Sequence, residues 1–206
     1  GYHSCMEMGN LEDGMMCWLA VTGYSLWDGY RLDKVERSTS DLLDQCRLYK
    51  VTTNIHVSRQ CNHICSILLG ISELDWDQVR AFGDTVESIT GSTDPVDEKD
   101  LLYAANNGYI LFLFVSILFD KFDVAEQLAH KIYNSTSIKN DPTHHINVNP
   151  PLYTGLMAAG MYRKTKNKKY LRKLRQMYKS SKGLWKKRGK RSMAFAFILR
   201  AEWKSL

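Results

Sequence analysis

Proline is scarce in this chain of 206 residues: only four are present, and three of them fall between Pro142 and Pro151. Because proline is the strongest breaker of helices, the long stretches outside that segment are free to be helical. No stretch alternates apolar and polar residues long enough to require a strand. With 44% hydrophobic and 24% charged residues, the composition is that of a globular chain rather than a disordered one.

The sequence also has little that would mark a membrane or secreted protein. Its longest apolar run, 109–119 (YILFLFVSILF), has about half the length of a bilayer span and predicts a buried helix. The N-terminal GYHSCMEMGN lacks the basic start and apolar core of a secretion signal. Five cysteines, an odd number at helical spacings, suit reduced thiols better than a disulfide framework. We therefore expect a cytoplasmic protein without a membrane span.

A complete catalytic motif is missing as well. The run GLWKKRGKRS, Gly183 to Ser192, resembles a phosphate loop, which needs four residues between its glycines and a hydroxyl residue after Gly-Lys. Here five residues separate Gly183 from Gly189, and Arg191 occupies the hydroxyl position. We interpret the run as the turn between two terminal helices. We expect neither an enzyme nor a cofactor in this chain.

The residues of this sequence that are capable of binding metal are better interpreted as core or loop residues. The densest group is His56, Cys61, His63 and Cys65, in which the two cysteines share a helix face. The same face carries Ile64 and Leu68, which favours packing in the core over a zinc site. We expect the pair His144-His145 to be exposed loop residues, so no metal is predicted.

Several carboxylates could be taken for acid–base residues. They stand where helices are expected to begin, and negative charge interacts favourably with a helix N-terminus, so capping is the better interpretation. These residues are Asp75, Asp77, Asp97, Glu98 and Asp100.

Apolar residues recur at helical spacing almost throughout, as in KKYLRKLRQMYK, where Tyr170, Leu171, Leu174, Met177 and Tyr178 share one face. The predicted fold class is all-α. Expected helices cover 1–8, 11–27, 32–50, 54–69, 75–88, 96–106, 108–120, 122–134, 150–163, 167–180 and 191–204, with a loop at 135–150 and basic C-terminal helices over 151–206.

One type of junction recurs along the chain. At 27–30, 119–122 and 165–170 an apolar helix ends, a few polar residues follow, and the next helix opens near an aromatic residue. Tyr30 and Phe122 lie 92 positions apart, with Trp76 midway, and Phe122 and Tyr170 lie 48 apart. Near-equal spacing of this kind predicts stacked antiparallel helical hairpins, a right-handed superhelix like that of tetratricopeptide repeats, or a piece of such a solenoid. We expect residues 1–206 to form a single helical-repeat domain.

Acidic residues are almost absent from the C-terminal third. From Gly1 to Asp141 the chain has 11 Lys and Arg against 21 Asp and Glu, whereas from Pro142 to Leu206 it has 17 against one, Glu202. Fifteen of those cations lie between Arg163 and Arg191. The candidate contact surface consists of Lys168, Lys169, Arg172, Lys173, Lys186, Lys187, Arg188, Lys190 and Arg191.

Three interpretations of this basic segment remain open. It is a solvated face that pairs with an acidic surface of a protein or of a neighbouring domain, which is the interpretation we favour. Alternatively, it binds nucleic acid, since Tyr170, Tyr178 and Trp185 are interleaved with the cations. The third alternative is an anionic membrane or another acidic partner. KKRGKR, Lys186 to Arg191, also resembles a short nuclear-localisation patch.

Three segments stand out along the chain: Gly9-Asn10 before a long expected helix, Gln60 to Gly70, and Tyr162 to Leu174. In these segments and in their order, over most of the chain except 72–95, the sequence resembles the helical, tetratricopeptide-like region of very large signalling ATPases. Those polypeptides join a kinase-like domain, a P-loop ATPase, this helical region and often a histidine kinase or nucleotide cyclase. The resemblance implies a non-catalytic scaffold for protein or interdomain contacts, and a piece of a longer chain. None of the family's nucleotide-binding or kinase residues has a counterpart here.

Overall fold

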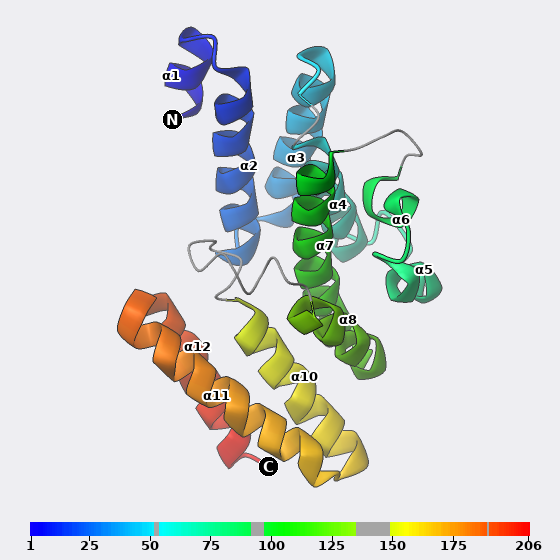
Figure 1. Cartoon of the computed structure of the whole chain (residues 1–206), viewed down its shortest axis with the longest axis vertical. Helices are drawn as coiled ribbons and strands as arrows, with labels where there is room; N and C mark the ends of the chain where they lie inside the picture. Colours follow the sequence, from blue (N-terminus) through cyan, green and yellow to red (C-terminus); the bar gives the residue numbers. More distant parts are fainter. Residues whose placement is uncertain (52–53, 92–96, 135–148, 189) are drawn as a thin grey trace. The chain divides into compact units, whose positions relative to one another are not determined.

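The computed structural model describes residues 1–51, 54–91, 97–134, 149–188 and 190–206. Within these ranges the protein is all-α, with eleven helices and no strand (Figure 1). The helices are α1 (Tyr2–Glu7), α2 (Leu11–Trp27), α3 (Leu32–Leu48), α4 (Ile55–Leu68), α5 (Trp76–Ala81), α6 (Val86–Thr90), α7 (Glu98–Leu118), α8 (Phe122–Asn134), α10 (Asn149–Thr165), α11 (Lys168–Arg188) and α12 (Lys190–Lys204). The predicted fold class is confirmed, with consecutive helices packed antiparallel. The right-handed superhelix stays a prediction.

Four of the predicted helices differ clearly from those observed. The expected helix 75–88 is two short helices, α5 and α6, with Gly83 at a φ of +87° between them. The expected helices 96–106 and 108–120 form the single helix α7, and the expected helix 167–180 continues to Arg188. Gly108 lies inside α7, and the Phe82 ring packs so closely on it that a Cβ there would collide with the ring. Glycine at this position therefore serves close packing rather than a turn.

The ends of five helices share one backbone motif. After α1, α2, α3, α4 and α7 the second residue beyond the helix adopts a left-handed φ, between +56° and +78°. The following N–H then donates to the carbonyl five residues back, as from Lys121 to Ser116 at 2.8 Å. This is the Schellman C-cap, which satisfies carbonyls that the helix leaves unpaired. The predicted junctions at 27–30 and 119–122 are two of these caps.

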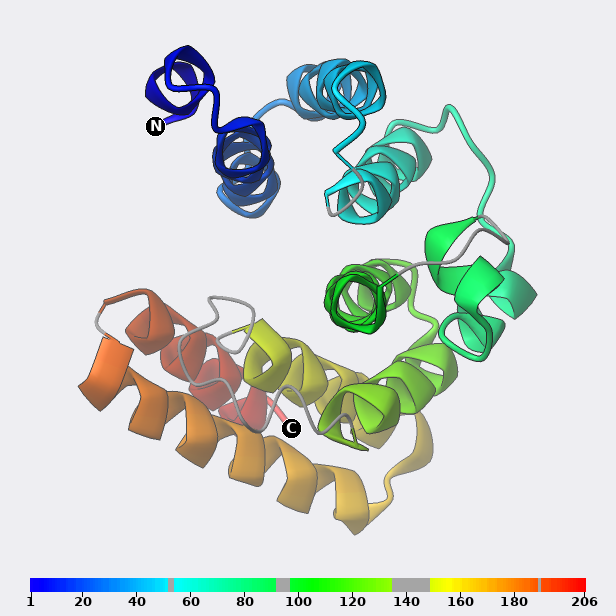
Figure 2. The same cartoon turned by 45° about the horizontal axis from the view of Figure 1, so that its top comes forward.

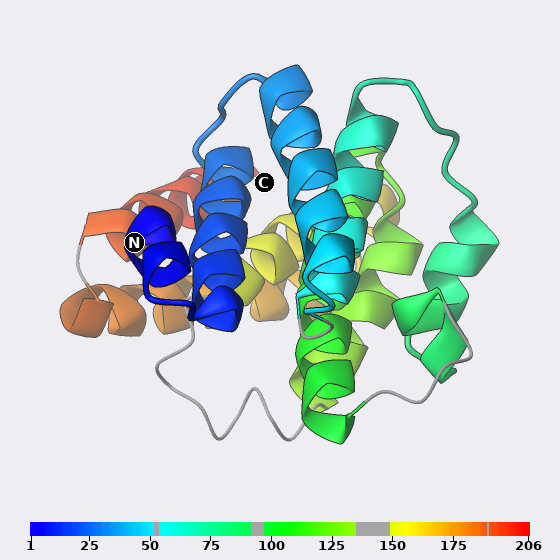
Figure 3. The ribbon, with the colours of Figure 1, turned by 90° about the horizontal axis from the view of Figure 1, so that it is seen from above.

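The chain divides into two compact units, Gly1–Gly108 and Tyr109–Leu206. In the first unit α1 contacts α2, α2 contacts α3 and α3 contacts α4, and Figure 3 shows α2, α3 and α4 side by side. Polar bonds join these neighbours: Trp18 Nε1 donates to Ser38 Oγ at 2.9 Å, and Asn62 Nδ2 donates to Ser40 Oγ at 2.8 Å. The division does not test the predicted single domain over 1–206, which stays a prediction.

The second unit is built around α10. This helix contacts α8, α11 and α12, and α11 also contacts α12 (Figure 2). Its core contains Leu128, Ile132, Ala158, Leu174 and Leu199, each fully buried. Of the predicted loop 135–150, residues 135–148 lie outside the described ranges, whereas Asn149 and Pro150 already belong to α10.

Helix α7 is longer than its apolar run. Its segment Asp100–Leu118 has the length and apolar composition to cross a membrane, which the eleven-residue run alone does not have. Half of this segment is buried inside the structure, and the core helix of a soluble protein passes the same test. The apolar run 109–119 was predicted as a buried helix, and Ile110, Leu113 and Val115 are indeed buried.

Candidate contact surface on the C-terminal helices

Helix α11 is fixed to the second unit by one narrow apolar face. Tyr170, Leu174, Met177 and Ser181 follow one another at intervals of three or four residues, and all four are buried. This is the periodicity of a helix with a single core-facing stripe. The rest of its circumference carries the basic residues.

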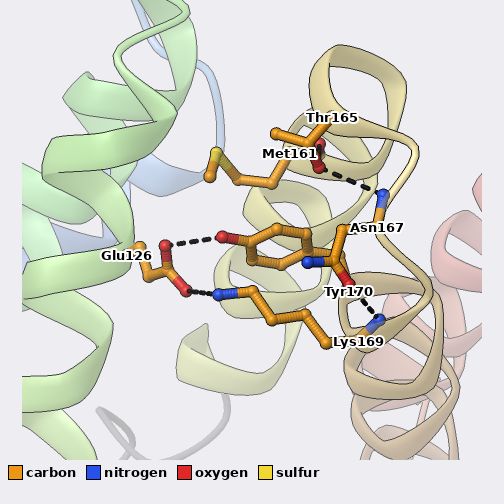
Figure 4. A network of polar contacts seen from close by, with 6 residues as sticks. All are labelled: Glu126, Met161, Thr165, Asn167, Lys169 and Tyr170. Atoms are coloured by element: carbon orange, nitrogen blue, oxygen red, sulfur yellow. Dashed lines mark hydrogen bonds and ion pairs between the residues drawn. The ribbon is translucent and has the colours of Figure 1, made fainter.

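The start of α11 is held by a network of polar contacts (Figure 4). The Asn167 side chain accepts the backbone N–H of Lys169 at 3.0 Å, which caps the first turn. From α8, Glu126 accepts the Tyr170 hydroxyl at 2.8 Å on Oε2 and faces the Lys169 ammonium at 3.4 Å from Oε1. One carboxylate thus fixes the N-terminal turn of α11 to α8.

The ammonium groups of two further lysines lie over aromatic rings. The ammonium of Lys173 lies 4.7 Å from the centre of the Tyr133 ring, and that of Lys164 lies 4.9 Å from the centre of the Phe122 ring. Lys164 also donates to the carbonyl of Asp120 at 2.8 Å. Contacts of this kind use the attraction between a cation and the ring face. Lys169 and Lys173, both predicted contact residues, therefore serve the packing of α11 on α8.

Among the α11 side chains that the structure describes, the remaining cations form a row, which we call the basic stripe: Lys168, Arg172, Arg175, Lys179 and Lys182. All five are exposed. Their spacings of four, three, four and three residues place them within an arc of about 80° on a helix that turns 100° per residue. The row is roughly 21 Å long at 1.5 Å per residue. Lys168, Arg172, Lys179 and Lys182 form no ion pair with any described residue.

The predicted contact residues lie in three different settings. Lys168 and Arg172 lie on the basic stripe, and Lys169 and Lys173 face α8. The backbone at Lys186, Lys187, Arg188, Lys190 and Arg191 is helical, but these side chains lie outside what the structure describes. The predicted turn 183–192 is wrong over most of its length, because α11 continues to Arg188 and α12 begins at Lys190.

Three stripe residues were missing from the predicted surface: Arg175, Lys179 and Lys182. A signal for them exists in the sequence, namely the heptad-like interval that starts at Lys168. The predicted helix 167–180 ended before Lys182 and so cut this interval short. In the structure nothing lies within 4 Å of the place where a Gly183 Cβ would stand, so this glycine has no packing role in α11.

The predicted metal-capable residues do not assemble into a site. Among the described residues, no three or more His, Cys, Asp or Glu side chains gather closely enough to hold a metal ion. Cys61 and Cys65 are buried, as expected for core residues, and their burial raises the pKa of the thiols to about 12 and about 11. His63 is exposed. His144 and His145 lie outside the described ranges.

His56 has a structural partner. Its Nδ1 lies 3.3 Å from the carbonyl oxygen of Thr90, at the end of α6, and Gln60 donates to the neighbouring carbonyl of Ile89 at 3.1 Å. Arg59 donates to the Thr90 carbonyl as well. One face of α4 therefore satisfies the last carbonyls of α6, which have no partner within that short helix.

The expected capping carboxylates lie at helix starts. Asp75 precedes α5 and accepts the N–H groups of Asp77 and Gln78, at 2.9 and 3.4 Å. Asp97 immediately precedes α7, and Glu98 and Asp100 belong to its first turn. These positions agree with a capping role.

Comparison of the chain with models of protein families, with curated proteins and with solved structures finds no match. Function is therefore argued from the surface of the protein itself.

Proposed function

We propose that this chain is a non-catalytic helical scaffold that binds an acidic protein surface, or an acidic neighbouring domain, through the basic stripe of α11. The observation that carries the proposal is the stripe itself. Five exposed cations follow one side of a helix whose opposite side is fixed in the core, and four of them have no ion pair among the described residues. A rigid row of like charges attracts an oppositely charged partner and orients it along the helix.

Two other features support a scaffold. Among the described residues, five helices end in the same C-cap, and α1 to α4 and α10 to α12 pack on their neighbours in sequence order, which is how helical-repeat proteins build an extended framework. A helical scaffold of this kind does not require a cluster of catalytic residues. A superhelix like that of tetratricopeptide repeats, and a place in a large cytoplasmic signalling ATPase that also carries kinase domains, are the finer form of this proposal and rest on the sequence resemblance.

A binding measurement with matched variants tests the proposal. Fluorescently labelled polyglutamate is titrated with the protein at physiological salt, and its anisotropy gives the dissociation constant. Arg172→Gln with Lys179→Gln removes two charges from the stripe, and Lys34→Gln with Arg37→Gln removes two exposed charges from α3. Each exposed ion pair is worth up to about 1 kcal/mol, so the stripe pair should weaken binding by roughly tenfold. Equal weakening by the α3 pair would show a response to net charge alone and would count against the stripe.

Binding of nucleic acid is the second candidate function. The same row of cations could follow the phosphates of a strand, and the two lysines and the arginine at 168, 172 and 179 have no competing carboxylate among the described residues. Affinity for single-stranded oligo(dT) would then fall steeply with salt, by about a thousandfold from low to moderate salt if six or more phosphates are engaged. The scaffold proposal instead expects little binding of oligo(dT) at physiological salt.

A further inference from the structure

The end of the basic stripe opens into a hollow between α11 and α12, with a volume of about 550 Å³. Tyr178 and Lys182 line it from α11, and Arg200, Trp203 and Lys204 line it from α12. The two helices pack side by side along their length (Figure 2). Lys182 belongs both to the stripe and to the hollow, so the two features form one continuous surface.

Aromatic rings contribute the apolar part of this hollow. The ring centres of Tyr178 and Trp203 lie 6.1 Å apart with their planes tilted by 43°, and both side chains are half-buried. The guanidinium carbon of Arg175 lies 5.3 Å from the centre of the Trp203 ring. One face of the indole is therefore already covered by a cation, and the two rings do not form a flat, open stacking platform.

The charge of the hollow is of one sign. Its three charged lining residues, Lys182, Arg200 and Lys204, are all cationic and all exposed. The single acidic residue of α12, Glu202, is not among the lining residues, because it pairs with Arg163 of α10 at 2.5 Å. An anionic group that enters the hollow would therefore meet three cations and no carboxylate from its lining.

An exposed apolar residue lies beside the cations of α12. Phe197 is 54% exposed. Phe197 precedes Arg200 by three residues and Lys204 by seven, which places all three on one side of the helix. A surface that alternates apolar and basic groups complements a chain segment that alternates apolar and acidic groups.

We propose that this hollow is the anchoring site for an acidic peptide segment, in which an apolar or aromatic side chain contacts Tyr178 and Trp203. Carboxylates on either side of that side chain pair with Lys182, Arg200 and Lys204. The proposal deepens the proposed function and rests on it, since it names where the acidic partner is anchored. A protein segment is favoured over nucleic acid because the exposed apolar ring of Phe197 gains nothing from a phosphate chain and because Arg175 already covers one face of the Trp203 ring.

The test uses two synthetic peptides of about ten residues, which exceed the length of the stripe when extended. One consists of Glu and Asp with a single central Phe, and the other has Ala in place of that Phe. Dissociation constants are measured by fluorescence anisotropy for the wild-type protein and for two variants with equal loss of charge. Lys182→Gln with Arg200→Gln alters the hollow, and Lys168→Gln with Arg172→Gln alters the far end of α11. All four residues are exposed, so neither variant removes core packing.

We expect the wild-type protein to bind the Phe peptide about tenfold more tightly than the Ala peptide, and the hollow variant to lose most of that difference. The far-end variant should weaken both peptides to the same extent and keep their ratio. If both peptides bind equally well and both variants weaken them equally, the hollow is not an anchoring site, although binding to the stripe stands. If neither peptide binds, the proposed function fails too. If oligo(dT) binds instead, and only the hollow variant abolishes its binding, the hollow binds nucleic acid and the peptide proposal is wrong.

Discussion

The Tyr170 hydroxyl donates a hydrogen bond of 2.8 Å to Glu126 Oε2 and so links α11 to α8 across the core of the second unit. The Tyr170 ring is buried, whereas the Lys169 ammonium that approaches the same carboxylate at 3.4 Å is exposed. Hydrogen bonds to a charged acceptor contribute more to stability than exposed ion pairs do, so the tyrosine should be the more important of the two partners.

The first prediction follows from this pair. Tyr170→Phe should lower the free energy of unfolding by about 1.5 kcal/mol, because it removes a hydrogen bond to a carboxylate without changing the packing of the ring. Lys169→Gln should lower it by less than about 1 kcal/mol. Unfolding in urea, followed by circular dichroism, measures both. Tyr162→Phe is the control, since its hydroxyl makes no hydrogen bond with a described residue; an equal loss in this variant would contradict the assignment.

The second prediction concerns two glycines with opposite roles. The Phe122 ring packs directly on Gly160 in α10, and a Cβ there would collide with it. Gly160→Ala should therefore destabilise the protein by at least about 1 kcal/mol through overpacking. Gly183 in α11 has open space around it, so Gly183→Ala should stabilise by up to about 1 kcal/mol through helix propensity. Urea denaturation of the two variants should give changes of opposite sign; a stable Gly160→Ala protein would contradict the close packing.

The third prediction is a pH dependence that arises from His56. Burial lowers the pKa of this imidazole, and the Arg59 charge lowers it too, although the Thr90 carbonyl and Asp100 act in the opposite direction. The unfolded chain therefore binds the proton more readily than the folded protein. The contribution of neutral His56 to the free energy of unfolding is complete above the ordinary histidine pKa of about 6.5. It should be lost progressively as the pH falls from there towards the lowered pKa of His56 in the folded protein.

His56→Gln is the variant that tests this dependence, because an amide can still donate to the Thr90 carbonyl but cannot become charged. The free energy of unfolding, measured in urea at neutral pH and at about pH 5.5, should differ less in this variant than in the wild type. His130→Gln, at an exposed position on α8, should keep the wild-type dependence. An unchanged pH dependence in His56→Gln would assign it to other groups. His63 is the first of these to examine, because partial loss of hydration lowers its pKa too, although its side chain is exposed.

The fourth prediction is selective thiol reactivity. All five cysteines are free, but Cys46, Cys61 and Cys65 are buried, whereas Cys5 and Cys17 are partly exposed. With pKa values of about 12 and about 11, the Cys61 and Cys65 thiols form almost no thiolate at neutral pH. Iodoacetamide should therefore modify at most Cys5 and Cys17 in the folded protein and all five in urea. Peptide mass spectrometry identifies the sites, and native modification at Cys61 would overturn the buried assignment.

Local patterns in the sequence determined the fold class and most helix positions. The bounds 11–27 and 122–134 agree with α2 and α8, because apolar periodicity and turn residues are short-range signals. The same kind of signal placed a break at Asn107, next to Gly108, and the end of a helix at Ser180, where the structure has neither. The sequence does not distinguish a glycine that forms a turn from one that allows close packing. Gly29 forms a turn at a φ of +78°, whereas Gly108 lies within a helix and makes room for the Phe82 ring.

The sequence by itself also determined that residues 163–191 are strongly basic. It did not determine which cations are available to a partner, since that depends on what lies beside each one. Tertiary structure places Lys169 against Glu126 and Lys173 against Tyr133, and leaves Lys168, Arg172 and Lys179 in an exposed row. It also brings Trp203 beside Tyr178, 25 positions away, because α12 folds back along α11. Charge is a property of residue type, whereas availability is a property of packing between segments distant in the chain, and only the tertiary structure decides it.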